Sequence, residues 1–263
     1  MHGTRMAKNE DGVIWMEDKN LLLKTGLLAG RIMMESGSEA YRVEDTMQRI
    51  ALNSKKLDTE SYVTATGIFM SINDESTSQM TQARNRSINL EKIDATNRYS
   101  RKYAEGNLSL EELYEALLAV DLQTPEFNKH YRMLAAGMAS FSLMLLLGGT
   151  YSDILTAFII GSVGYFASNR IHYHTQMKFI NDLIASFIIS MLSVFSYRLG
   201  LAANLDSLII GCIMPLVPGL AITSGLRDLF EGHLLTGIVR LVEAILISLV
   251  IGTGIALTLQ WFS

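Results

Sequence analysis

The sequence contains a single cysteine, Cys212, among its 263 residues. Disulfide frameworks and cysteine-based zinc sites each need several cysteines, so both are excluded, and we expect no bound metal and no cofactor. The first 15 residues also lack the apolar core of a secretory signal peptide. We therefore expect the N-terminal region to stay in the cytosol.

No block of basic residues is present, and the net charge is −4. Nucleic-acid binding relies on clustered Lys and Arg side chains, so that class of function is not indicated. A serine-glycine elbow and a glycine-rich phosphate loop are absent as well, and His2 and His130 are the only histidines in the first 130 residues. The chain is therefore not expected to be an enzyme.

Charge is scarce in the second half of the chain. Of 22 basic and 26 acidic side chains, only 12 lie after residue 130. A helix needs roughly 20 apolar residues to cross a bilayer, and five charge-free windows approach or reach that length. They are 133–152, 154–169, 183–197, 207–226 and 244–263. We predict a disordered tail over 1–18, a cytosolic α+β domain over 19–128 and an all-α domain of five transmembrane helices over 129–263.

The cytosolic domain opens with a helix from Lys19 that Gly37 ends. Ser36 and Glu39 have the spacing of a capping box for a second helix. Apolar and polar residues nearly alternate over 62–74, which predicts a strand, and 78–88 can return beside it as a second strand. A helix is predicted over 89–106, and Ser109 with Glu112 is predicted to cap the helix that follows. Basic residues precede the first span and lie in the connection 170–179, so the positive-inside rule places the N-terminus in the cytosol and the C-terminus outside.

The fourth span is expected to be broken, because Pro215 and Pro218 remove backbone donors and Gly219 tolerates unusual dihedral angles. Irregular backbone at membrane depth survives where it is buried in protein or lines a cavity. A half-helix beginning near Gly219, with Thr223 and Ser224 close by, would direct free N–H groups at a carboxylate-bearing solute. A kinked structural helix is the alternative.

Placing a charged side chain inside or beside a membrane span costs free energy, so such residues usually face the protein interior and mark the path of a substrate or ion. Arg240 and Glu243 share a helix face at the start of the last span, and we expect them to pair, with Glu243 orienting Arg240. Arg227 and Glu231 are also on one face, with Asp228 beside them. A salt-bridged cytosolic corner is the other interpretation. The predicted substrate-binding residues are Pro215, Pro218, Gly219, Thr223, Ser224, Arg227, Asp228, Arg240 and Glu243.

A second motif lies in the cytosolic domain and consists of Gly37, Glu39, Arg42 and Glu44. These charges either bind a ligand or form a solvated helix face with weak i,i+4 pairs. His172 and His174 could bind metal or carry protons, but an i,i+2 pair does not share a helix face, and we expect a solvated loop there.

Two stretches, AGRIMMESGSEAYRVEDTMQRIA (29–51) and PLVPGLAITSGLRDLFEGHLLTGIVRLVEA (215–244), together resemble the threonine/serine exporter family. The likeness extends from about Leu21 to the end. It implies the large, N-terminal subunit of the family's split, two-protein form, which works with a small multi-span membrane partner. It also implies export of threonine and serine, or of a C4 dicarboxylate such as succinate, driven by the proton gradient.

We therefore expect a multi-pass protein of the cytoplasmic membrane that acts as a secondary transporter subunit in a homo- or hetero-oligomer. Both classes of solute carry a carboxylate, so the residues do not separate them. The competing hypothesis is a membrane-anchored metabolite sensor or adaptor without transport of its own.

Overall fold

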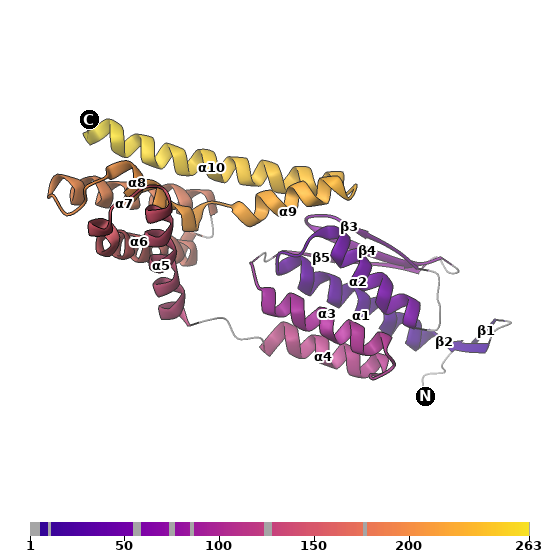
Figure 1. Cartoon of the computed structure of the whole chain (residues 1–263). Coiled ribbons are helices and arrows are strands. Elements are labelled where there is room, and N and C mark those ends of the chain that lie inside the picture. The colour runs from indigo at the N-terminus through magenta and orange to yellow at the C-terminus, as the bar shows by residue number, and fades with distance from the viewer. Residues whose placement is uncertain are drawn as a thin grey trace. The chain divides into compact units, whose positions relative to one another are not determined.

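The computed structural model describes residues 6–9, 12–54, 59–73, 77–84, 87–123, 128–175 and 178–262 (Figure 1). The chain folds into two compact units, each built from two separate stretches of sequence. The N-terminal unit consists of Met1–Pro125 and Ala221–Leu241, and the helical unit consists of Glu126–Leu220 and Val242–Ser263. The segment 221–241 thus folds with the N-terminal residues, a grouping that a division at residue 128 does not anticipate.

Four helices and a small sheet make up the first stretch of the N-terminal unit. The helices are α1 (Met16–Glu35), α2 (Ala40–Asn53), α3 (Leu90–Ala104) and α4 (Leu110–Gln123). The strands β3 (Thr59–Val63), β4 (Gly67–Ile72) and β5 (Thr77–Gln82) form one antiparallel sheet in that order. Two further strands, β1 (Met6–Asn9) and β2 (Gly12–Trp15), pair with each other inside the stretch expected to be a disordered tail.

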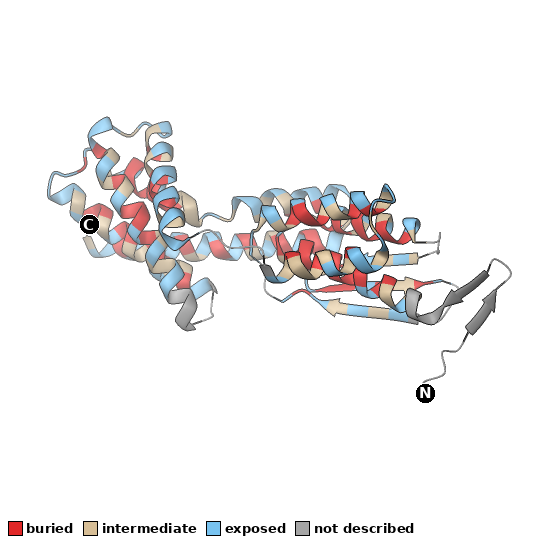
Figure 2. Ribbon diagram, turned by 90° about the horizontal axis from the view of Figure 1, so that it is seen from below, coloured by how far each residue is buried: buried red, intermediate tan, exposed pale blue. Residues whose placement is uncertain are grey.

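Helix α1 forms the centre of the core of this unit. Its side chains at helical spacing, Leu22, Leu23, Ile32 and Met33, are almost completely buried, as the apolar pattern predicts. Helices α2, α3 and α4 and the strands β4 and β5 all contact it. Figure 2 shows the buried residues running along these helices and the sheet.

Helix α1 ends next to Gly37, as the sequence predicts. Gly37 has φ +90°, a left-handed conformation that glycine adopts without steric cost. The N–H of Ser38 donates to the Met33 carbonyl and the N–H of Gly37 donates to the Met34 carbonyl, which is the Schellman pattern. The chain therefore reverses sharply between α1 and α2.

The sheet contains one strand more than the predicted hairpin. Residues 62–74 do not form one strand, because the chain turns between β3 and β4 at Thr64. The Thr64 hydroxyl accepts a hydrogen bond from the Gly67 N–H at 2.9 Å, and the Thr64 N–H donates to the Gly67 carbonyl at 2.8 Å. Threonine hydroxyls stabilise such turns only weakly, and Thr64 lies among β-branched and aromatic residues that are typical of a strand. The turn could therefore not be recognised from the sequence.

The helical unit contains α5 (Lys129–Leu146), α6 (Ile154–Thr175), α7 (Lys178–Arg198) and α8 (Leu205–Ile213), with short 3-10 turns η1 (Tyr151–Asp153) and η2 (Met214–Leu216). The helix α9 (Gly219–Phe230) follows η2, and α10 (Leu234–Phe262) ends the chain. The backbone at His172 and His174 is helical, so the prediction of a loop there was wrong. The sequence around them has no glycine or proline that would end α6.

Small residues bring the helices of this unit close together. A Cβ at Gly161 of α6 would lie 2.1 Å from the Ser140 hydroxyl of α5, and one at Gly254 of α10 would lie 2.1 Å from the Ser186 hydroxyl of α7. A real Cβ atom cannot approach another atom this closely, so only glycine at these positions lets the helices pack at this separation. The close approach of helices is the packing that small residues allow in membrane proteins.

Asp153 ties two connections of the helical unit together. Its carboxylate accepts hydrogen bonds from the Ala203 N–H at 2.9 Å, the Asn204 N–H at 3.2 Å, and the hydroxyls of Thr150 and Ser152. Burial alone would raise the pKa of Asp153, but these hydrogen bonds outweigh it and hold the pKa below its ordinary value.

Within the part of the chain that the structure describes, two helices are long and apolar enough to cross a membrane. They are Phe179–Arg198 and Leu234–Phe262, and the pair of segments Leu205–Leu216 and Gly219–Phe230 qualifies as a third if it counts as one broken span. The helix break around Pro215 and Pro218 agrees with the sequence. Five spans remain a prediction, because α5 and α6 do not meet the same criterion.

Exposed apolar side chains support a membrane environment for the helical unit. Monomeric soluble proteins rarely expose large contiguous apolar patches. On the helical unit many large apolar side chains are exposed, among them Leu155, Ile159, Phe166, Phe195 and Leu249. In a bilayer, lipid would cover such side chains.

Candidate functional site

The second stretch of the N-terminal unit is a helical corner, defined here as residues 221–241 and formed by the end of α9 and the start of α10. Gly232 turns the chain with φ +89°, and the His233 N–H donates to the Asp228 carbonyl at 2.8 Å. Gly225 and Gly237 let the two helices approach closely, since a Cβ at Gly237 would lie 2.7 Å from the Leu229 side chain. The corner is therefore a tight helical hairpin.

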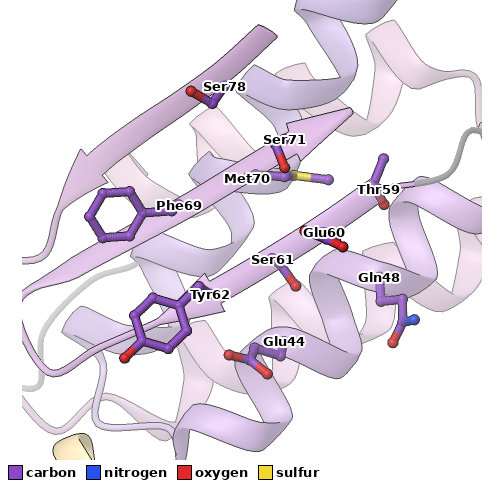
Figure 3. A pocket seen from close by; sticks show the side chains of 10 residues that line it. All are labelled: Glu44, Gln48, Thr59, Glu60, Ser61, Tyr62, Phe69, Met70, Ser71 and Ser78. Atoms are coloured by element: carbon purple, nitrogen blue, oxygen red, sulfur yellow. The ribbon is translucent and has the colours of Figure 1, made fainter. Parts of the chain in front are cut away.

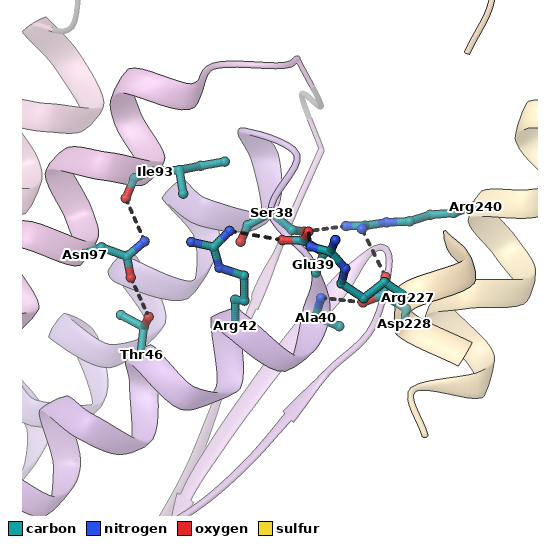
Figure 4. A network of polar contacts seen from close by, with 10 residues as sticks. All are labelled: Ser38, Glu39, Ala40, Arg42, Thr46, Ile93, Asn97, Arg227, Asp228 and Arg240. Atoms are coloured by element: carbon teal, nitrogen blue, oxygen red, sulfur yellow. Dashed lines mark hydrogen bonds and ion pairs between the residues drawn. The ribbon is translucent and has the colours of Figure 1, made fainter. Parts of the chain in front are cut away.

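This corner packs on the turn between α1 and α2. Arg240 donates a hydrogen bond from Nη2 to the Ser38 carbonyl at 2.7 Å, and the same nitrogen lies 3.4 Å from the Met34 sulfur. The Thr236 hydroxyl donates to the Val63 carbonyl at the end of β3 at 3.4 Å. The two stretches of sequence that carry the family resemblance thus meet in space (Figure 4).

Asp228 caps the N-terminus of α2 from outside that helix. Its Oδ1 accepts a hydrogen bond from the Ala40 N–H at 2.8 Å. The N-cap residue Glu39 makes no side-chain capping bond. The predicted capping box of Ser36 and Glu39 was therefore wrong: the free N–H of the first turn is satisfied by a carboxylate 188 residues away in sequence.

Asp228 also forms the buried ion pair of the corner. Its Oδ2 lies 3.0 Å from Nη1 of Arg240, and their side chains are 0% and 8% exposed. The contact has the distance of an ion pair without the angles of a hydrogen bond, since neither atom has a hydrogen-bond partner. Glu243 was expected to be the partner of Arg240, and the ion pair at 3.0 Å adds Asp228 as a partner that the sequence did not indicate. Glu243 belongs to the helical unit.

A more exposed set of charges surrounds this pair. Arg227 lies 2.8 Å from Glu39, and Arg42 approaches the other oxygen of Glu39 at 3.5 Å. The side chains of Arg227 and Arg42 are 57% and 44% exposed, whereas that of Glu39 is 12% exposed. Arg227 was expected beside Glu231 on its own helix, but its partner is Glu39 of the cytosolic motif.

Glu44 makes the remaining link between the cytosolic motif and the corner. Its Oε1 accepts a hydrogen bond from the Val63 N–H at 2.9 Å, and its Oε2 lies 3.7 Å from Nε2 of His233. The four motif residues therefore have distinct positions: Gly37 shapes the turn, Glu39 and Arg42 reach Arg227, and Glu44 contacts His233.

The other predicted substrate-binding residues do not join this cluster. Pro215 lies in η2, and α9 begins at Gly219, whose N–H donates to the Val217 carbonyl at 2.8 Å. The idea that Gly219 presents a free N–H to a solute is therefore not supported by its geometry. Thr223 is exposed on α9 and Ser224 is partly exposed.

Sequence reasoning missed Ser38, Ala40, Val63, His233 and Thr236. Ser38, Ala40 and Val63 contribute backbone atoms, which leave no side-chain signal. In the described ranges no group of three or more His, Cys, Asp or Glu residues could hold a metal ion. Chemically, the corner cluster is a set of carboxylate-guanidinium contacts around a helix N-terminus and contains no nucleophile-base pair.

Comparison with known proteins agrees with the resemblance. A family model described as a putative threonine/serine exporter matches residues 24–262. The probable threonine/serine exporter of Mycobacterium tuberculosis is 25% identical over 263 residues, which covers 97% of this chain and 49% of that protein. The probable succinate transporter subunit YjjP of Klebsiella aerogenes is 22% identical over 128 residues, covering 48% of this chain and 50% of that protein.

An uncharacterized protein of Schizosaccharomyces pombe is 24% identical over 238 residues, covering 86% of this chain and 31% of that protein. The chain thus spans about half or less of the length of these curated relatives. No solved structure gives a significant match.

The buried pair predicts a non-additive pattern of stabilities. Arg240→Met leaves the Asp228 carboxylate buried without its cation and should cost about 3–5 kcal/mol of unfolding free energy, as should Asp228→Leu. The double variant should lose much less, about 1 kcal/mol for the missing helix cap. Denaturant unfolding in mild detergent, followed by circular dichroism, measures all three.

Arg227→Met is the matched control, because its pair with Glu39 is exposed and should be worth about 0–1 kcal/mol. A double variant whose loss equals the sum of the two single losses would show that Asp228 and Arg240 do not act as a pair.

Proposed function

The chain belongs to the putative threonine/serine exporter family, and we propose that it is a subunit of a secondary transporter that exports a small carboxylate-bearing metabolite across the cytoplasmic membrane. The metabolite is threonine or serine, or a C4 dicarboxylate such as succinate, and the proton gradient drives its export. The names of the relatives supply these two classes of solute.

The observation that supports this proposal most is the contact between Arg240 and the Asp228 carboxylate. A guanidinium that holds a carboxylate in a nearly water-free site has the chemistry that recognises a carboxylate-bearing solute. In the proposed mechanism the carboxylate of the solute replaces that of Asp228 on Arg240. Asp228 also caps α2, so this exchange would loosen the corner from the turn between α1 and α2.

The second part of the proposal concerns assembly and span number. The Klebsiella relative is named a subunit, and we propose that this chain, with five spans, acts with a small multi-span membrane partner as a homo- or hetero-oligomer. Small residues such as Gly252, where an added Cβ would meet no atom of another part of the chain within 4 Å, offer a surface for close contact between subunits.

Orientation follows from the basic residues. Lys129, His130 and Arg132 lie in the first turn of α5, Arg170 lies near the end of α6 and Lys178 begins α7, so we propose that these ends face the cytosol. A reporter enzyme active only outside the membrane should therefore be active when fused after Ser263 and silent when fused after Thr124. Cytosolic behaviour of the Ser263 fusion would rule out five spans with this orientation.

Efflux from proteoliposomes tests the transport proposal directly. Vesicles containing the chain and its partner should release labelled threonine or succinate when a proton gradient is imposed. Arg240→Lys should abolish release while the protein stays folded, because an ammonium cannot reproduce the planar fork of a guanidinium. Thermal unfolding of the same sample checks the fold.

Arg101→Lys, an exposed change on α3, is the matched control and should leave efflux unchanged. If no small carboxylate is released under any gradient, the chain is a membrane-anchored sensor or adaptor and not a transporter subunit. Wild-type efflux from Arg240→Lys would remove this residue from the solute path.

A further inference from the structure

A cavity of about 550 Å³ lies in the N-terminal unit beside β3 (Figure 3). Its volume is within the range of about 300–1,000 Å³ that small-molecule sites occupy. Helix α2 and all three strands of the sheet contribute to its wall. The lining residues are Glu44, Gln48, Thr59, Glu60, Ser61, Tyr62, Phe69, Met70, Ser71 and Ser78.

Two aromatic side chains stand at one end of this cavity. Tyr62 of β3 and Phe69 of β4 are partners in the antiparallel register, so they project from the same face of the sheet. Their ring centroids are 6.3 Å apart with an interplanar angle of 37°, and the residues are 55% and 42% exposed. Figure 3 shows both rings at the same side of the cavity. These rings present open π faces instead of packing into the core.

The two charged side chains among the described residues that line the cavity are both acidic. They are Glu44 and Glu60. Glu60 is exposed and lies two residues before Tyr62 on the same strand, so both side chains are on the same face of the sheet. Hydroxyl groups of Tyr62, Ser71 and Ser78 lie on this same face, whereas those of Thr59 and Ser61 belong to the opposite face of β3.

We propose that this cavity binds a small solute that carries an ammonium group. Aromatic faces attract a cation within about 6 Å of the ring centroid, and a carboxylate beside them adds a charge-assisted hydrogen bond. Hydroxyl groups on the wall suit a polar body on the ligand. A dianion is disfavoured, because the carboxylates of Glu44 and Glu60 would repel it.

The site is distinct from the guanidinium of Arg240, which takes an anion. The cavity therefore recognises the opposite end of an amino acid from the end that the corner recognises. Binding at the cavity is independent of transport, and its test does not depend on the efflux proposal.

Isothermal titration of the full chain in mild detergent at low salt tests the inference. Ethanolamine is the cationic probe, threonine the zwitterion and succinate the dianion. Ethanolamine should bind tightest, threonine should bind more weakly because its carboxylate faces Glu44 and Glu60, and succinate should not bind at this cavity.

Two variants assign the binding to the cavity. Glu60→Gln removes the charge and Phe69→Leu removes the π face while keeping apolar volume, and each should weaken ethanolamine binding by about 5- to 10-fold. Glu44 is left intact, since its carboxylate also holds the Val63 N–H. Glu111→Gln, an exposed acidic change on α4, is the control and should have no effect.

Absence of ethanolamine binding to the wild-type chain would overturn the proposal. So would binding that is unchanged in both Glu60→Gln and Phe69→Leu, provided that thermal unfolding shows both variants to be folded. Succinate binding that Glu60→Gln strengthens or abolishes would also contradict it, because the cavity would then accept a dianion.

Discussion

The buried ion pair of Asp228 and Arg240 is the interaction on which the arrangement of the N-terminal unit depends. It lies where the helical corner meets the turn between α1 and α2, and each partner also holds backbone of that turn. Asp228 accepts from the Ala40 N–H, and Arg240 donates to the Ser38 carbonyl. Taking two charges out of water is costly, and the cost is offset only when geometry is good and further polar groups are satisfied. The backbone contacts satisfy the other carboxylate oxygen of Asp228 and Nη2 of Arg240, whereas the two atoms that form the ion pair make no hydrogen bond.

This constraint also gives the site its proposed function. In our proposal a carboxylate-bearing solute replaces Asp228 on Arg240, and this exchange gives the corner a second arrangement. The exposed guanidinium groups of Arg227 and Arg42 beside the pair contribute little to stability, and their positive charge is suited to attract an anion.

Much of the fold could be predicted from local sequence, and the site only in part. Side-chain spacing in α1, the stop at Gly37 and the cap of Ser109 with Glu112 are local, and the structure has each of them. The pairing of Arg240 with Asp228 could not be found in this way. Glu243 is close in sequence, but Asp228 lies across a helical hairpin whose tightness depends on Gly225 and Gly237. The third strand was missed because a threonine turn leaves no glycine-proline signal before Gly67.

Hydrogen exchange of the Ala40 amide tests most directly whether the corner is clamped to α2 by Asp228. We expect this amide to be protected in the wild-type chain and to exchange much faster in Asp228→Ala, because the acceptor of its hydrogen bond is then lost. The Val43 amide, which donates to the Glu39 carbonyl, and the Lys92 amide, which Asn89 caps, should be accelerated far less than the Ala40 amide, and only by the loss of global stability. Equal exchange of the Ala40 amide in wild type and variant would contradict the clamp.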